Sequence, residues 1–404
     1  MSWSWLRRTA TGRGRRPDIW LILAVGILLI VGLIIIYSIS PVLSHKLLGD
    51  VSSNHFLYGQ LVHIGLGLAG FGIAASWHYE RWQKLLPWLL VVCGLSLLLL
   101  LIPGLGVSKN GATRWVDLGL FSYQPVELMK LTLVIYLATH FSRPVATPKD
   151  SQHRLLVALG VLGLLAIFVL FAQRDMGTMM VLVVILVGQF YASGVRLAHV
   201  GWLGLIGSGV GIASILLFPH RLARLLTYLD PAQNATTTGY HLNQALIAIG
   251  SGGLMGLGIG KSVQVYGYLP EAANDSIFAI AGETLGFLGI GLILVVFGIM
   301  IYRGLRISLL APNRYGQLLV LGLVLWVASQ AVINMAAMLG LIPLTGVPLP
   351  FLSYGGTSLV MVLTAMGIVA NVSKFSQRGL YADRPLGRRQ RRTSYAAAYR
   401  RLSP

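Results

Sequence analysis

The chain has 404 residues, of which 55% are hydrophobic and only 11% are charged, and its mean hydropathy is +0.75. This composition excludes an ordinary soluble protein, in which about a quarter of the residues are charged. The 31 lysines and arginines outnumber the 12 aspartates and glutamates, which gives a formal charge of +19. We assign this charge to membrane lipids rather than to nucleic acid, because it is concentrated beside apolar segments, where basic clusters hold anionic headgroups. The single cysteine, Cys93, excludes a disulfide framework within the chain.

Apolar runs recur along the chain, each close to the roughly 20 residues with which a helix crosses a bilayer. Backbone inside a bilayer must satisfy its own hydrogen bonds, so we predict that these runs are transmembrane helices. The fold class is therefore an all-α polytopic membrane protein with about ten spans and a long extracytoplasmic loop between spans seven and eight. The predicted spans are 19–40, 58–76, 86–104, 123–141, 155–172, 176–193, 197–218, 276–302, 316–341 and 353–373.

Basic residues set the predicted orientation of these spans. They are concentrated before the first span, in the connections after the fourth and eighth spans, and after the last one. All of these segments fall on one side if the N-terminus is cytoplasmic, as the positive-inside rule requires, and an even number of spans puts both termini there. We therefore divide the chain into a basic cytoplasmic tail at 1–18, a membrane domain at 19–373 and a second basic cytoplasmic tail at 374–404.

The first polar cluster on the predicted outer side contains Lys109 and Arg114. Gln124, Glu127 and Lys130 follow at the head of the fourth span. Glu127 and Lys130 are three residues apart, so they share one face of a helix and can neutralise each other. Two interpretations stay open for this pair: a structural ion pair, or a functional pair beside an outer cavity.

The loop at 219–275 is far longer than compact connections usually are, and such loops are commonly functional or disordered. Its tyrosines and its aliphatic stretch from Leu242 to Ile249 argue against disorder. The stretch from Gly250 to Gly260 is dense in glycine. We predict short amphipathic helices on the outer leaflet, joined by glycine turns.

Two aspartates stand out on the predicted outer side because acidic residues are scarce. Asp175 lies in a tight turn between two spans, where a cap or turn role is expected. Asp275 lies where the long loop enters the eighth span. It is either the N-cap of that helix or a functional carboxylate, because charged groups at a membrane are costly and are retained for function.

The segment from Ile342 to Ser358 contains three prolines and three glycines, so it cannot be regular helix. Irregular backbone at membrane depth is tolerated only where it lines a cavity or is buried in protein. This segment therefore predicts a cavity that opens outward.

Motifs of several other enzyme classes are missing. Gly260-Lys261-Ser262 resembles the end of a P-loop, but Met255 stands where the first glycine should be. The histidines form no His-Glu-x-x-His motif, and the chain has no Gly-x-Ser-x-Gly motif. Nucleotide binding, a zinc site and serine hydrolysis are therefore not expected, and no metal ligands are assigned.

The polar blocks together resemble the SEDS family (shape, elongation, division and sporulation), which includes FtsW and RodA, over about residues 19–373. One departure is Arg174, where members of the family usually carry proline, and it puts the geometry of that turn in question. The matching segments are Arg114-Trp115, Gln124-Pro125 with Glu127 and Lys130, Asp175-Met176-Gly177-Thr178, Gly239 to Gly253, Leu269 to Asp275, and Pro348 to Gly356.

The resemblance implies a peptidoglycan glycosyltransferase that polymerises lipid II at the outer face of the bacterial inner membrane. It also implies a class B penicillin-binding protein, a transpeptidase, as partner, together with other divisome proteins. The family's essential aspartate falls on Asp275. The substrate-binding residues expected from the matching motifs are Arg114, Lys130, Glu127, Gln124, His241, Gln244, Ser353 and Tyr354, and Lys109 of the first polar cluster is expected to join them.

A mechanism follows from the chemistry of glycan extension. A carboxylate within hydrogen-bond reach can take the proton of the attacking sugar hydroxyl, which is the role expected of Asp275. The departing undecaprenyl pyrophosphate needs positive charge beside it. Arg114, Lys130, Lys109 or a bound divalent cation, Mg²⁺ or Mn²⁺, are the candidate sources.

Three alternatives stay open. A flippase or transporter of lipid-linked substrates would also have many spans and a proline-broken cavity. A non-catalytic scaffold would tolerate the loss of Asp275. Within the family, the length and the basic extensions at both ends favour the division-type member at the septum over the elongation-type RodA polymerase.

Overall fold

The computed structural model describes residues 16–48, 54–100, 105–109, 112–117, 122–143, 148–194 and 238–376, with isolated residues between these ranges. The described helices are α1 (Ile19–Leu48), α2 (His55–Ser76), α3 (Glu80–Leu99), α4 (Pro125–Ser142), α5 (Pro148–Ile167), α6 (Met176–Ser193), α9 (Thr238–Ser251), α10 (Ile277–Leu309), α11 (Arg314–Met338) and α12 (Gly356–Lys374). A π-helical turn, η2 (Phe168–Ala172), continues α5, and a 3₁₀ turn, η3 (Gln264–Tyr266), precedes α10.

Seven described helices are long and apolar enough to cross a membrane, namely α1, α2, α3, α6, α10, α11 and α12. They fall on the predicted spans one to three, six and eight to ten, and α4 and α5 fall on the fourth and fifth. The predicted seventh span at 197–218 and both basic tails lie largely outside the described residues. The all-α, polytopic fold class is confirmed.

A small antiparallel sheet precedes α4 and was not predicted. Its strands are β1 (Gly106–Lys109), β2 (Ala112–Asp117) and β3 (Ser122–Tyr123), in the order β1-β2-β3. Val107 pairs with Trp115, and Val116 pairs with Tyr123. The sheet contacts α4 and α12, so it holds Arg114 of β2 close to the helix bundle.

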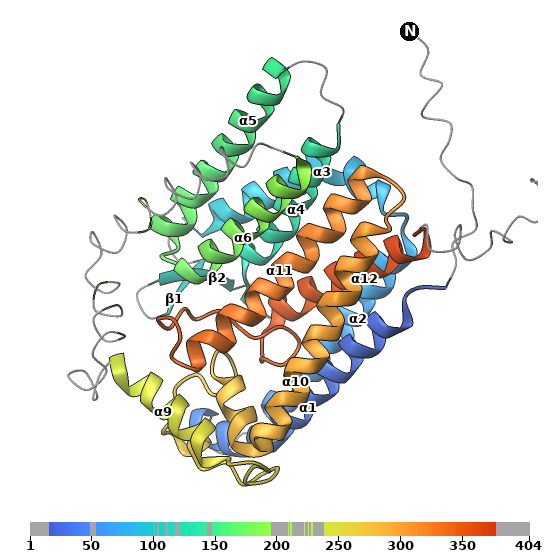
Figure 1. The fold of residues 1–404 in the computed structure, drawn as a ribbon. Coiled ribbons are helices and arrows are strands. Elements are labelled where there is room, and N and C mark those ends of the chain that lie inside the picture. Colours follow the sequence, from blue (N-terminus) through green and yellow to red (C-terminus); the bar gives the residue numbers. More distant parts are fainter. Residues whose placement is uncertain are drawn as a thin grey trace, which may run out of the picture.

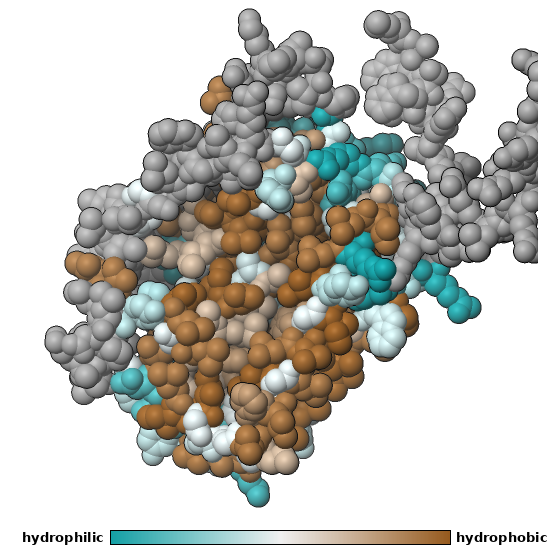
Figure 2. Space-filling model, in the orientation of Figure 1, coloured by the Kyte–Doolittle hydropathy of each residue, from teal (hydrophilic) through white to brown (hydrophobic). Residues whose placement is uncertain are grey.

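Helix α11 forms the centre of the described bundle, in contact with α4, α6, α10 and α12, and α1 lies against α10 (Figure 1). It is also the most deeply buried of the candidate spans. The visible described surface is mostly apolar (Figure 2), as expected of helices that face lipid.

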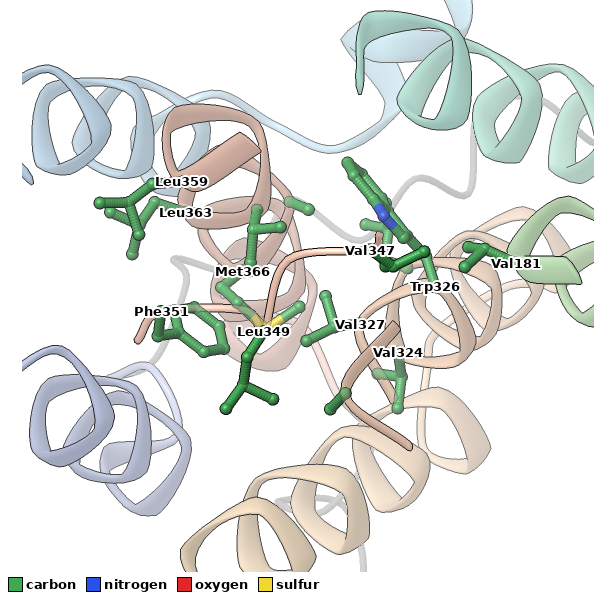
Figure 3. Close-up of a cluster of buried hydrophobic side chains, with 14 of the residues drawn as sticks. Val181, Val324, Trp326, Val327, Val347, Leu349, Phe351, Leu359, Leu363 and Met366 are labelled. Carbon is green, nitrogen blue, oxygen red and sulfur yellow. The ribbon is translucent and has the colours of Figure 1, made fainter. Parts of the chain in front are cut away.

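The connection from α11 to α12 is irregular, and it is mostly buried from Val347 to Gly355. Gly346 and Phe351 have positive φ angles of 72° and 67°. The side chains of Val347 and Leu349 lie in the hydrophobic core, among residues of α6, α11 and α12 (Figure 3). The prediction of irregular backbone is confirmed, whereas the cavity that opens outward stays a prediction. We call residues 339–355 the broken segment.

Helix α9 confirms the expected short helix in the long loop. The glycine stretch after it, which was predicted only to form turns, also pairs with the backbone of α10. Helix α10 is interrupted at Gly286, where φ is 69° and ψ is −170°. The glycine stretch hydrogen-bonds to the backbone on both sides of this interruption. The bonds are Leu257 N to Glu283 O at 2.9 Å, Gly258 N to Thr284 O at 3.1 Å, Phe287 N to Gly253 O at 2.9 Å and Leu288 N to Leu254 O at 3.1 Å.

We predict that Gly286→Ala destabilises the protein. Its backbone conformation is accessible essentially only to glycine, and forcing another residue into it costs about 1–3 kcal/mol. A β-carbon there would also lie 2.2 Å from Gly256 N, so the paired backbone would have to separate. Thermal unfolding of the detergent-solubilised protein measures the effect.

Gly298→Ala is the matched control in the same helix, because a β-carbon there meets nothing within 4 Å. It should leave the melting temperature unchanged or raise it, since alanine favours helix over glycine by up to about 1 kcal/mol. Equal melting temperatures for the two variants would contradict the packing described here.

Candidate active site

Asp275 is not the N-cap residue of α10. The N-cap residue is Ser276, and α10 begins at Ile277 with no capping bond from a side chain. One residue, Ser276, thus separates Asp275 from the first helical residue, and this placement does not support the capping interpretation. Its backbone carbonyl accepts a hydrogen bond from Asn334 Nδ2 at 2.7 Å, and the residue is half-buried.

The loop that carries Asp275 is fixed to the broken segment. Ser353 Oγ donates to the carbonyl of Asn274 at 2.7 Å and accepts from Leu349 N at 2.8 Å. Tyr354 N donates to the carbonyl of Ala273 at 2.8 Å. The hydroxyl of Ser353 is thus engaged within the protein and holds the Asp275 loop, whereas its role as a substrate contact stays a prediction.

The side chain of Tyr354 points away from this backbone contact. Its ring packs edge-on against Phe56 and His63 of α2, with centroids 5.2 Å and 5.6 Å apart. Tyr354 therefore joins α2 to the site, and its predicted role as a substrate contact is not supported by this placement.

Asp275 and Arg114 meet at Gly346 of the broken segment. A β-carbon built on Gly346 would lie 3.3 Å from Asp275 Oδ2 and 3.8 Å from Arg114 Nη1. The φ angle of 72° also favours glycine here. The carboxylate of Asp275 and the guanidinium of Arg114 therefore share one small site, although residues 114 and 275 are 161 positions apart in the sequence.

Arg114 is oriented by the turn between η2 and α6. Its Nε donates to the carbonyl of Gln173 at 3.2 Å, and its Nη2 donates to the carbonyl of Arg174 at 2.9 Å. Asp175 Oδ2 lies 3.8 Å from Arg114 Nε, and the Asp175 side chain caps α6 by accepting from Thr178 N at 3.0 Å. The predicted cap role of Asp175 is confirmed. The Arg114 side chain remains 22% exposed.

Glu127 and Lys130 form a buried ion pair. Lys130 Nζ lies 2.8 Å from the Glu127 carboxylate and 3.0 Å from Gln330 Oε1. Both side chains are only 2% exposed, and the Lys130 ammonium also lies 5.2 Å from the ring centroid of Trp326. This placement supports the structural interpretation of the pair. The assignment of Lys130 and Glu127 to substrate binding stays a prediction, and the pair would have to open before either group could contact a substrate.

Two amides of α11 were missed by the sequence analysis. Gln330 Nε2 donates to the carbonyl of Pro348 at 3.1 Å, and Asn334 Nδ2 donates to that of Val347 at 2.7 Å. They are four residues apart, so they occupy one face of the helix. The sequence did contain a signal that could have revealed them, namely two amide side chains at helical spacing within an apolar span. Such side chains are costly to bury unless they are hydrogen-bonded.

The remaining predicted residues lie at the edges of the site. His241 of α9 shares a 2.7 Å hydrogen bond with Ser276 Oγ, and Gln244 follows one turn later on α9. Gln124 is buried at the head of α4, where its backbone N donates to Thr357 Oγ1 at 3.2 Å. Lys109 lies in β1, and its side chain is outside the described part of the chain. In that described part, no three His, Cys, Asp or Glu side chains gather as metal ligands.

Comparisons with known proteins agree on one family. The family model for FtsW, RodA and SpoVE, described as "Cell cycle protein", matches residues 19–378. The chain is 39% identical to Stage V sporulation protein E of Bacillus subtilis over 370 residues, which is 91% of this chain and 100% of that protein. It is 37% identical to the probable peptidoglycan glycosyltransferase FtsW of a Thioalkalivibrio species, over 92% of this chain and 93% of that protein.

Solved structures are similar as well. A chain of a peptidoglycan synthase complex matches with a TM-score of 0.68 and 27% identity, over 89% of this chain and 98% of that one. The rod shape determining protein RodA of Thermus thermophilus matches with a TM-score of 0.62 and 28% identity, over 90% of this chain and 98% of that one.

We predict that Lys130→Ala lowers the stability of the protein strongly. Removing one partner of a buried ion pair leaves the other charge uncompensated, which costs about 3–5 kcal/mol. The double variant Glu127→Gln with Lys130→Met removes both charges and should recover most of the loss. Thermal unfolding of the three proteins measures this difference. If Lys130→Ala kept a native melting temperature and lost only activity, the pair would belong to the substrate site instead.

Proposed function

This chain belongs to the FtsW/RodA/SpoVE family of cell cycle proteins, and we propose that the site around Asp275 is its catalytic centre. The chain is a peptidoglycan glycosyltransferase that polymerises lipid II into glycan strands in cell division, as the names of its FtsW relatives support. The observation that carries the assignment of the site is the approach of Asp275 Oδ2 and Arg114 Nη1 to Gly346.

Asp275 is the general base in this proposal. Its carboxylate takes the proton of the acceptor sugar hydroxyl as the oxygen attacks the anomeric carbon of the donor, and the bond from that carbon to undecaprenyl pyrophosphate breaks. Asn334 fixes the backbone of Asp275 and that of Val347 with one amide group. This fixation matters because a displacement of about 1 Å can reduce the rate a hundredfold.

Arg114 stabilises the departing pyrophosphate in this proposal. A guanidinium presents several donors in a fixed plane and pairs well with phosphate oxygens. Two backbone carbonyls and Asp175 hold Nε and Nη2, while Nη1 lies towards Gly346 and Asp275. Mg²⁺ or Mn²⁺ would be held by Asp275 and the substrate's phosphates, since Mg²⁺ usually binds through one or two carboxylates plus phosphate oxygens, and would add further positive charge.

The buried charges do not favour the transporter alternative. Glu127 is paired with Lys130. Glu283 accepts hydrogen bonds from Ser262 Oγ and, at 2.8 Å and 3.2 Å, from the backbone N atoms of Val263 and Gln264. These groups stabilise the fold, whereas an ion or proton relay needs ionisable groups that exchange partners.

The cellular placement is part of the proposal. The protein spans the bacterial inner membrane with both termini in the cytoplasm, and its active site faces outward at the division septum. The basic residues on the predicted inner side support this orientation. The FtsW names of several relatives support the division role over an elongation role of the RodA type.

The proposed partner is a class B penicillin-binding transpeptidase, acting with other divisome proteins. One of the similar solved structures is that of a peptidoglycan synthase complex, which is said to coordinate polymerization and crosslinking. In this chain, Leu254 and Met255 of the glycine stretch and Phe287 of α10 are exposed apolar side chains near one another, because the glycine stretch pairs with the interruption of α10. Such a surface suits a single-pass partner that packs by shape.

Asp275→Asn is expected to abolish glycan polymerisation while the protein still folds and inserts. The amide keeps the shape of the side chain but cannot accept the hydroxyl proton. Asp275→Glu should lose on the order of a hundredfold in rate, since one methylene moves the base by about 1 Å. Gel analysis of glycan strands from reconstituted protein and lipid II measures both.

Glu80→Gln is the matched control, because Glu80 lies at the start of α3, outside the proposed site, and accepts a hydrogen bond from Asn313 Nδ2. It should polymerise normally. Near-normal product from Asp275→Asn would exclude a general-base role, and it would favour a scaffold or another base.

We also predict that the reconstituted enzyme is weakly active alone and that the cognate transpeptidase raises its rate. The partner would stabilise the glycine stretch and the Asp275 loop, which shifts the population towards the competent site. Glycan yield with and without the partner measures the gain. The double variant Leu254→Ser with Met255→Ser should lose the gain, whereas Leu309→Ser, at the other end of α10, should keep it. Equal rates with every candidate partner would reject the coupling.

A further inference from the structure

His241 of α9 joins the long loop to the segment that carries the proposed base. Its Nε2 shares a 2.7 Å hydrogen bond with Ser276 Oγ, and Ser276 Oγ donates in turn to the carbonyl of Pro270 at 2.8 Å. A serine hydroxyl has one hydrogen, so with that hydrogen directed at Pro270 the oxygen accepts from the imidazole. His241 is therefore the donor, through an N–H on Nε2.

Ser276 holds together the two ends of the loop that carries Asp275. It follows Asp275 directly, it is fully buried, and its hydroxyl reaches back to Pro270 at the start of the loop. Between these ends, Glu271 has a left-handed φ of 48°, and its carbonyl accepts from Ser276 N at 3.3 Å. A residue other than glycine keeps such a conformation only where its surroundings impose it. The hydrogen bond from His241 thus ends on the residue that closes a strained turn around the proposed base.

Helix α9 is itself fixed, so it presents the imidazole from a firm support. It contacts α10 and α11. Its residues Ala245 and Ala248 are fully buried, and Leu242 Cδ1 lies 3.5 Å from a β-carbon built on Gly340, at the start of the broken segment. His241 adjoins Leu242, so the histidine is held where the long loop packs on the bundle.

We propose that His241 is a positioning residue for the transfer reaction, acting on Asp275 through Ser276, in place of the substrate contact expected from the sequence. This inference rests on the function proposed above. A displacement of the base by about 1 Å can cost about a hundredfold in rate, so losing this one hydrogen bond should lower kcat. The donated bond goes to the protein rather than to the substrate, so KM should not depend on it.

Two variants separate the hydrogen bond from the bulk of the side chain. In His241→Gln the amide nitrogen lies about as far from the backbone as Nε2 does and donates in its place, whereas the shorter His241→Asn does not reach Ser276. His241→Asn should lower kcat more than about tenfold while KM changes less than about twofold, and His241→Gln should recover most of the rate. Steady-state glycan synthesis from lipid II by the reconstituted proteins measures both constants.

A double-mutant cycle tests whether His241 acts through Ser276. Ser276→Ala removes both hydrogen bonds of the hydroxyl, so adding His241→Asn to it should lower kcat no further. The melting temperature of His241→Asn should stay close to that of the native chain, because Ser276 keeps its bond to Pro270. His45→Asn is the matched control, since His45 is an exposed histidine in the last turn of α1, and it should keep the native kcat and KM.

Four outcomes overturn the inference while the polymerase function stands. A raised KM with native kcat in His241→Asn would make His241 a substrate contact, and native values of both would leave it without a role. Equal losses in His241→Asn and His241→Gln would show that the ring matters rather than the donated bond. Losses that multiply in the double variant would show that His241 does not act through Ser276.

Failure of the native chain to polymerise lipid II would instead reject the proposed function itself. If His241→Asn does not fold, His241→Phe takes its place in every comparison, because phenylalanine keeps a ring of similar shape and has no donor.

Discussion

The site depends on how the carbonyl groups of the broken segment are satisfied inside the bundle. Regular helix pairs its own backbone, but prolines and glycines prevent helix at 339–355, and unpaired carbonyls in an apolar interior are costly. Gln330 and Asn334 of α11 meet this requirement by donating to Pro348 and Val347. Asn334 also donates to the backbone carbonyl of Asp275, so one of the two amides that stabilise the segment also positions the residue that carries the carboxylate.

Lys130 and Arg114 are two cationic side chains near the site, and they differ in how deeply they are buried. This difference separates a charge that stabilises the fold from one that can bind substrate. Lys130 is 2% exposed, and Glu127 and Gln330 engage its ammonium. Arg114 is 22% exposed, and its guanidinium is oriented by carbonyls on one side while the other side lies towards Gly346. An ammonium that is already paired in the interior can bind an incoming anion only if that pair opens. Arg114 needs no such rearrangement, and for this reason it is the better candidate for the pyrophosphate.

Close backbone contacts connect the long loop to the site. The glycine stretch pairs with the interruption of α10 at Gly286, and Glu283 on the same helix binds the loop at Ser262 and Val263. Asp275 lies immediately before this helix. A partner or lipid that moves the glycine stretch would therefore move α10. The loop that carries the proposed base, Asp275, leads directly into this helix.

The sequence by itself determined the membrane class and the positions of most helices, and it singled out Asp275 as the candidate catalytic residue. These conclusions rest on local properties, because apolar length decides whether a helix spans a membrane and an isolated carboxylate beside such a helix needs a function. The motifs that resemble the SEDS family could also be identified from the sequence, since they are short and occur in a fixed order along the chain. The cap at Asp175 was also readable, because capping involves only the first turn of one helix.

Only the tertiary structure decided which residues share the site. It brings Arg114 and Asp275 together at Gly346, and it pairs Glu127 with Lys130 rather than opening them to the site. It also turns Ser353 into a positioning residue. These outcomes depend on contacts between segments far apart in the chain, where spacing along the sequence says nothing about distance. Burial separates a paired group from an available one, and burial is a property of the packed bundle rather than of any single helix.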